Sequence, residues 1–162
     1  MMEPRMDLMA NETGAKISKR FAGVSLLIQQ SSLPKSLQEL LSLRASQIIG
    51  CGFCVDFHTK EAAAAGEAPL KLHLVAAWHH TTVFTEAEQA ALALTEEVTR
   101  LGDGNQGVSD ETWARVRKHY DDDQIAALVY LVALINAAAR LGVTLNHLGG
   151  AYEVGMFDKY AN

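Results

Sequence analysis

Residues 39–66, ELLSLRASQIIGCGFCVDFHTKEAAAAG, contain the only two cysteines of the 162-residue chain. Cys51 and Cys54 stand three positions apart, and His58 follows four positions after the second cysteine. Glu39 precedes the first cysteine by twelve positions. Apolar residues recur at helical spacing on both sides of the glycine before the first cysteine, which predicts two helices joined by a turn. Because side chains three and four positions apart share a helix face, we expect both thiols and the imidazole in one line.

The rest of the chain follows the same helical pattern. None of the three prolines interrupts a periodic segment, and alternating strand-like runs are nearly absent. Thr85 and Glu88 form a capping box, and Ser109 is a second N-cap. The fold class is therefore predicted to be all-α, one compact domain over residues 1–162 with about six to seven helices. Helices are expected at about 14–30, 34–49, 53–65, 68–80, 90–101, 110–120 and 123–146, with a core of about 15–145 and a C-terminal tail at 148–162.

Composition and charge exclude several classes of protein. Fourteen basic and nineteen acidic residues give a net charge of −5, and no Lys/Arg cluster indicates a nucleic-acid or membrane surface. We see neither a signal-peptide core near the start nor an apolar run long enough to span a membrane, so a cytoplasmic location is expected. Structural disulfides are rare in the cytosol, which favours reactive or metal-bound cysteines. The helix at 123–146 is apolar almost all round and predicts burial in the centre or against another subunit.

The spacing of the two thiols favours redox chemistry. An i,i+3 pair on a helix has Cα atoms about 5–6 Å apart, which a disulfide accepts. In the first turn of a helix, unpaired N–H groups and the positive end of the dipole stabilise a thiolate. His58 could take the proton of Cys54, and an antiparallel helix hairpin would bring Glu39 back to orient this histidine. Two thiols, an imidazole and a carboxylate suit reduction of a peroxide O–O bond followed by disulfide closure.

Each part of this pattern has a simpler alternative. The cysteines could be two small core residues, or C-x2-C-x3-H could supply three zinc ligands, with Glu39, His79, His80 or water as the fourth. Glu39 taken alone would be a surface glutamate that pairs weakly with Lys35. His79 and His80 suit a capping role at a helix end. The remaining histidines, which have no companions in the sequence, are expected to be structural or solvated: His73, His119 and His147.

Around these residues the chain resembles the AhpD-like alkylhydroperoxidase family of the carboxymuconolactone decarboxylase superfamily. The family pattern is a glutamate, eleven residues, C-x-x-C, three residues and a histidine, and this chain matches every interval. The flanking LRASQIIGCGFCVDFHTKEA and the later AAWHHTTVFTEAEQAALALTE and LINAAARL are also similar, so the likeness covers roughly residues 15–145. One position departs: members of the family carry a histidine before the second cysteine, where this chain has Phe53. We therefore expect weaker activity or a preference for a different hydroperoxide.

The resemblance implies roles for the residues. Cys54 would attack the peroxide and become a sulfenic acid, Cys51 would resolve it to a disulfide, and Glu39 and His58 would relay protons. The helix dipole alone would instead favour Cys51 as the more acidic thiol. No metal or organic cofactor is implied. An external dithiol, a lipoylated or thioredoxin-like protein, would restore the thiols, and the family assembles as trimers or hexamers.

Three functions are therefore compatible with the sequence. The leading hypothesis is a thiol-dependent peroxidase that reduces organic hydroperoxides. The alternatives are a general thiol–disulfide oxidoreductase and a non-catalytic helical binding protein whose thiols sense the redox state. The physiological peroxide, the reductant and the choice between trimer and hexamer lie beyond what the sequence specifies.

Overall fold

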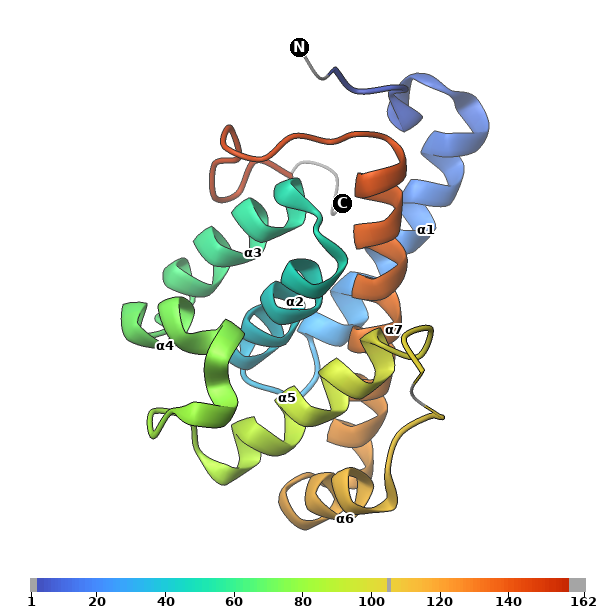
Figure 1. Ribbon diagram of the computed structural model, residues 1–162. Coiled ribbons are helices and arrows are strands. Elements are labelled where there is room, and N and C mark those ends of the chain that lie inside the picture. The colour runs from blue at the N-terminus through green and yellow to red at the C-terminus, as the bar shows by residue number, and fades with distance from the viewer. Residues whose placement is uncertain (1–2, 105, 158–162) are drawn as a thin grey trace.

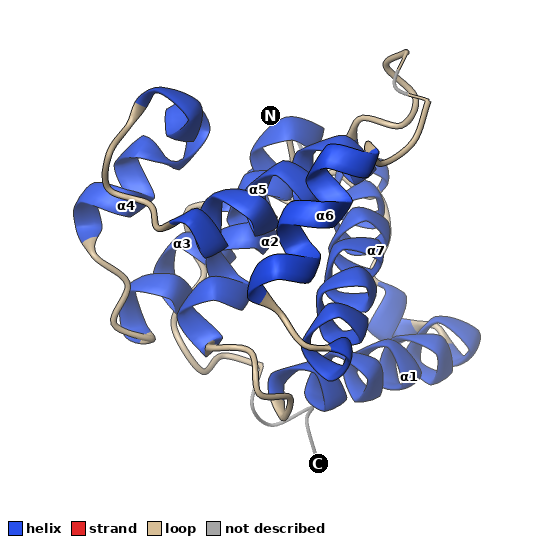
Figure 2. Ribbon diagram, turned by 90° about the horizontal axis from the view of Figure 1, so that it is seen from below, coloured by secondary structure: helices blue, strands red, loops and turns tan. Residues whose placement is uncertain are grey.

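The computed structural model describes residues 3–104 and 106–157, and all regular structure within them is helical (Figures 1 and 2). The prediction of an all-α fold is thereby confirmed. Residues 158–162 of the predicted tail lie outside the described residues. The α-helices are α1 (Glu12–Gln29), α2 (Lys35–Ile49), α3 (Gly52–Ala64), α4 (Pro69–Leu74), α5 (Glu86–Thr99), α6 (Asp110–His119) and α7 (Asp122–Thr144), with short 3-10 helices η1 (Leu8–Ala10) and η2 (Val75–His80).

The N-terminal ends of the helices show which predicted capping residues the structure confirms. Thr85 forms the predicted capping box at the start of α5, and Ser109 accepts a hydrogen bond from Thr112 N–H at the start of α6. At the start of α2, by contrast, Pro34 occupies the N-cap position and no side chain caps the helix. A second capping box, formed at α7 by Asp121, was not predicted.

The single helix expected at 68–80 is two pieces. α4 ends at Leu74, and η2 continues with a non-helical backbone at Ala77 (φ −119°, ψ 26°). This change of direction accompanies burial of Val75 and Trp78, and the Trp78 indole N–H donates to the carboxylate of Glu96 on α5. Tertiary packing and this hydrogen bond therefore override the helical propensity of the local sequence.

α2 lies at the centre of the fold, between α3, α5 and α7 (Figure 1). It buries residues on nearly all sides, and Leu40, Leu41 and Ala45 are fully inaccessible to solvent. The main core continues into α5 through Leu92 and Leu94. Because burial fixes α2 so firmly, a polar side chain on this helix has a well-defined position from which to act.

α7 is buried on one face only. Its inner face includes Leu128, Val132 and Ala139, whereas Val129 and Tyr130 on the outer face are 45% and 63% exposed. α7 passes a length-and-composition test for a membrane span, as the core helix of a globular bundle also does. Since α7 packs against α1, α2, α3 and α5, the core explains the apolar residues of its inner face.

Candidate functional site

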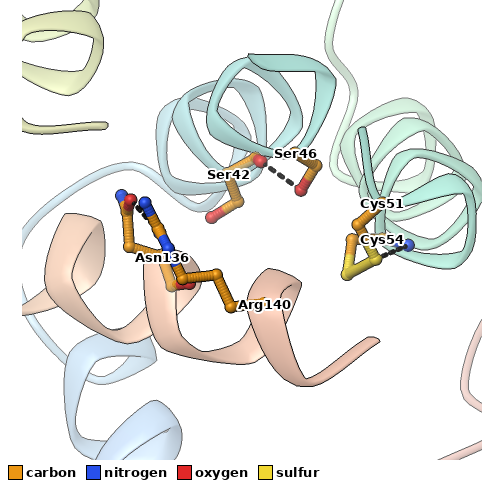
Figure 3. Close-up of a disulfide and its surroundings, with 6 residues drawn as sticks. All are labelled: Ser42, Ser46, Cys51, Cys54, Asn136 and Arg140. Atoms are coloured by element: carbon orange, nitrogen blue, oxygen red, sulfur yellow. Dashed lines mark hydrogen bonds between the residues drawn. A yellow bond between two sulfur atoms is a disulfide. The ribbon is translucent and has the colours of Figure 1, made fainter. Parts of the chain in front are cut away.

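The two cysteines lie at the turn between α2 and α3. Gly50 adopts a left-handed conformation (φ 81°) that ends α2, and Cys51 is the N-cap of α3. Cys51 Sγ accepts a hydrogen bond of 3.2 Å from the N–H of Cys54. The two residues form a disulfide with Cα atoms 5.3 Å apart, as the helical spacing predicted. Figure 3 shows this disulfide at the start of α3, facing α7.

Glu39 and His58 form a buried pair beside the disulfide. His58 Nδ1 lies 2.7 Å from Glu39 Oε2, and the side chains are 15% and 8% exposed. The hairpin of α2 and α3 therefore brings the carboxylate back onto α3, as predicted. The alternative partner of Glu39 was wrong, because Lys35 lies 3.2 Å from the carboxylate of Glu61 instead. A carboxylate on Nδ1 fixes the orientation of the imidazole and leaves Nε2 available for proton transfer.

A largely apolar cavity of about 580 Å³ connects these residues. Cys54, His58 and Glu39 all line it, together with apolar side chains of α1 and α7. Cys51 is not part of the lining and is only 1% exposed, whereas Cys54 is 7% exposed. A small molecule in the cavity would therefore meet the Cys54 sulfur first.

Gly142 on α7 is a close neighbour of the disulfide that the sequence analysis did not single out. A Cβ at this position would lie 2.6 Å from Cys51 Sγ and 3.5 Å from Cys54 Sγ. Only a residue without a side chain fits here while the disulfide keeps its place. A glycine inside an otherwise apolar, periodic helix is the signal that could have indicated this close approach.

The histidines outside the Glu39 pair have different surroundings. His147 was expected to be structural or solvated, but it lines the cavity and its ring lies edge-on to Phe53, with centroids 5.9 Å apart. It reaches this place because Asn146 is left-handed (φ 60°) and folds the chain back at the end of α7. His73 is exposed, and His119 Nε2 lies 3.8 Å from Glu86.

His79 belongs to a separate polar cluster around Glu96 on α5. Its Nε2 lies 3.4 Å from Glu96, whose carboxylate also accepts hydrogen bonds from Arg44 and Trp78. Burial raises the pKa of Glu96, but these donors outweigh it, so the pKa lies below its ordinary value. Within residues 3–104 and 106–157, no group of three or more His, Cys, Asp or Glu side chains is arranged to hold a metal ion.

The residues after α7 fold over α3, a feature that the sequence did not predict (Figure 1). We call residues 149–157 the C-terminal segment. Asp56 Oδ2 accepts the N–H groups of Gly150 and Tyr152, at 2.7 and 3.1 Å, and Lys60 donates to the Tyr152 carbonyl. The Tyr152 hydroxyl donates to the buried carboxylate of Glu61. Side chains of α3 therefore hold the segment at three points.

The acidic residues that hold the segment are stabilised as carboxylates. Hydrogen bonds from Lys60 and from Gly150 N–H lower the pKa of Asp56. Burial raises the pKa of Glu61, but hydrogen bonds from Tyr152 and Lys35 outweigh this and leave the pKa below its ordinary value. The contacts between α3 and the segment thus favour the charged forms.

Residues 16–97, just over half of the chain, match the family model described as the carboxymuconolactone decarboxylase family. The chain belongs to this family. Its AhpD-like character is supported by a solved structure from Agrobacterium tumefaciens, a protein of unknown function associated by name with the antioxidant defence protein AhpD. That structure has a TM-score of 0.83 and 27% identity, over 93% of this chain and 100% of the other.

Two further relatives of this AhpD-like family member are informative. The uncharacterized protein YdfG of Bacillus subtilis is 35% identical over 119 residues, which span 74% of this chain and 80% of YdfG. An alkylhydroperoxidase AhpD core structure of an uncharacterized peroxidase-related protein from Ralstonia eutropha has a TM-score of 0.72 and 17% identity, covering 88% and 74% of the two chains. At that identity the likeness concerns the fold alone.

Proposed function

We propose that this AhpD-like protein is a thiol-dependent peroxidase that reduces organic hydroperoxides through Cys51 and Cys54, as a single domain. One observation carries the proposal: a cysteine pair that can close to a disulfide presents Cys54 on the wall of an apolar cavity, which Glu39 and His58 also line. Peroxide reduction needs these three elements, namely a sulfur nucleophile, a neighbouring thiol and a proton carrier.

The reaction balances with these residues. The Cys54 thiolate attacks the outer peroxide oxygen, the O–O bond breaks, and Cys54 becomes a sulfenic acid. The departing alkoxide takes a proton, which we assign to the Nε2 side of His58 with Glu39 on its Nδ1 side. The Cys51 thiol then attacks the sulfenic sulfur, releasing water and closing the disulfide. The external dithiol returns two electrons and two protons.

The burial of the sulfurs distinguishes this proposal from its rivals. A general thiol–disulfide oxidoreductase must present a sulfur to folded proteins, yet the two cysteines are 1% and 7% exposed. A passive redox sensor would have no need of the Glu39–His58 pair. The same burial favours a slender reductant such as a lipoyl group over the surface of a thioredoxin-like protein. We place the reaction in the cytoplasm, where such dithiols keep cysteines reduced.

Exposed apolar residues support assembly into a homo-oligomer. Ile17 and Leu27 on α1 are 59% and 69% exposed, and Leu141 on α7 is 44% exposed. Surfaces of this kind are usually covered by another subunit. A trimer or hexamer in sedimentation experiments would agree with this part of the proposal, and a monomer at micromolar concentration would contradict it.

The decisive experiment follows peroxide-treated, pre-reduced protein by mass spectrometry. A disulfide between Cys51 and Cys54 should form within the turnover time of cumene hydroperoxide. Cys54→Ser should abolish turnover with a dithiol, whereas Cys51→Ser should trap the sulfenic acid on Cys54. Undiminished turnover of Cys54→Ser would refute the mechanism. Faster oxidation by a model disulfide than by the hydroperoxide would favour the oxidoreductase instead.

A further inference from the structure

The C-terminal segment places a group of aromatic rings beside the cavity. Phe157 lies with its ring centroid 6.1 Å from Phe53 and 6.1 Å from Phe57, stacked on the latter at 29°. Tyr152 lies 4.4 Å from Phe57 and 5.8 Å from Phe157. Rings from α3 and from the C-terminal segment therefore form one cluster, and aromatic contacts at these distances are favourable.

Three members of this cluster also face the cavity. Phe53, Phe57 and Phe157 line it together with Cys54. Phe53 and Phe57 lie on the same helix as the sulfur, one residue before it and three after it. Phe157 reaches the cavity from the C-terminal segment, which side chains of α3 hold at Gly150 and Tyr152.

The close approach of the segment to α3 also depends on glycine. A Cβ at Gly149 would lie 2.4 Å from the carbonyl oxygen of Gly52. Two glycine backbones in contact allow the chain to cross the first turn of α3, immediately beside the cysteines. The rings of the segment are thereby held near the sulfur and are part of the site's fixed shape.

We propose that Phe157 of the C-terminal segment, with Phe53 and Phe57, sets the specificity of the site for hydroperoxides with an aromatic or branched alkyl group. This inference rests on the proposed peroxidase function and adds the substrate class. A ring or tertiary alkyl group gains apolar contact with the three phenylalanines, while its peroxide faces Cys54. Hydrogen peroxide has no such group, so the rings contribute nothing to its binding.

The test compares Phe157→Ala with a matched control, Trp113→Ala. Both side chains are exposed to the same extent, 40% and 41%, but Trp113 lies on α6 and does not line the cavity. In Phe157→Ala we expect kcat/KM for cumene hydroperoxide to fall about tenfold, the loss of one aromatic contact. For hydrogen peroxide we expect a change within about twofold, and for Trp113→Ala no change with either peroxide.

An equal fall for both peroxides would overturn the inference and assign Phe157 a general structural role. An unchanged rate with cumene hydroperoxide would overturn it as well. The unreactive alcohol 2-phenylpropan-2-ol separates the inference from the proposed function, because its binding is measured by calorimetry without turnover. Binding to the wild type that weakens in Phe157→Ala supports the aromatic site even if no peroxide is consumed. No binding to the wild type refutes it.

Discussion

The two sides of the cavity are built differently. On one side, α2 and α3 present Glu39, His58 and Cys54 from regular helices, and these three side chains are largely buried. On the other, the C-terminal segment has no regular structure and is held by side-chain contacts with α3. Chemistry that moves protons and electrons needs fixed distances, and the helical side supplies them for the reacting groups. The segment instead supplies part of the apolar wall of the cavity, through Phe157.

The largest expected effect is at the helical side. Glu39→Gln keeps the volume of the side chain but removes the charge that faces His58 Nδ1. We expect kcat/KM for cumene hydroperoxide to fall by about 100-fold, in the range of a lost acid–base pair. Steady-state kinetics across pH measures it, and Glu111→Gln on α6 is the control. A fall of less than threefold would show that the carboxylate does not assist the reaction.

The next effect concerns the contact between α7 and the disulfide. Gly142→Ala places a methyl group against Cys51 Sγ, and we expect a loss of about 1–3 kcal/mol in the free energy of unfolding. Gly23→Ala on α1 is the matched control, because nothing lies within 4 Å of its Cβ. Alanine there should stabilise the protein by up to about 1 kcal/mol. Urea denaturation of the oxidised proteins measures the free energy of unfolding of both variants. Equal changes in Gly142→Ala and Gly23→Ala would contradict the close contact between Gly142 and the disulfide.

A smaller effect is expected for the C-terminal segment. Tyr152→Phe removes the hydroxyl that donates to Glu61 but keeps the ring in the aromatic cluster. We expect a loss of about 1 kcal/mol in the free energy of unfolding and little change in turnover of hydrogen peroxide. Denaturation and kinetics on the same samples check both parts. If Tyr152→Phe and Glu39→Gln lowered the turnover of hydrogen peroxide equally, the C-terminal segment would contribute to the chemistry as much as the helical side does.

The smallest effect is a pH dependence of the same contacts. The pKa values of Asp56 and Glu61 are lowered in the folded protein, so the unfolded chain binds more protons in acid. Their contribution is complete above the ordinary carboxyl range of about 4 and is lost as pH falls through the lower folded values. The stability difference between wild type and Glu61→Gln should therefore shrink from pH 6 to pH 3. If the stability difference between wild type and Glu61→Gln instead grew as the pH fell, the pKa of Glu61 would be raised in the folded protein, which would contradict the prediction.

The sequence predicted the helical side much better than the C-terminal segment. The spacing of Cys51, Cys54 and His58 is local to the start of one helix, so periodicity alone indicated that the two sulfurs can meet and that Cys54 and His58 share a face. Glu39 required one further assumption, an antiparallel hairpin, which the glycine turn supported. These predictions needed only short-range geometry and the family pattern.

The remaining features depend on contacts between distant parts of the chain. His147, Tyr152 and Phe157 lie about a hundred residues from α3 in the sequence, and nothing periodic marks them. Gly142 stands out as a glycine inside an apolar helix, but the sequence did not identify its neighbour, which is a sulfur outside that helix. The break within 68–80 arose from a hydrogen bond between Trp78 and Glu96 that no local signal encodes.

The capping contact of Cys51 limits how much the start of α3 must reorganise between the reduced and oxidised states. Its sulfur accepts the N–H of Cys54 while both sulfurs are joined, so the oxidised helix retains the bond that starts its first turn. A thiolate would accept that N–H more strongly, because the acceptor then carries a full charge. The helix would thus begin at the same residue in both redox states, and the reorganisation on each cycle would be confined to the two sulfur atoms.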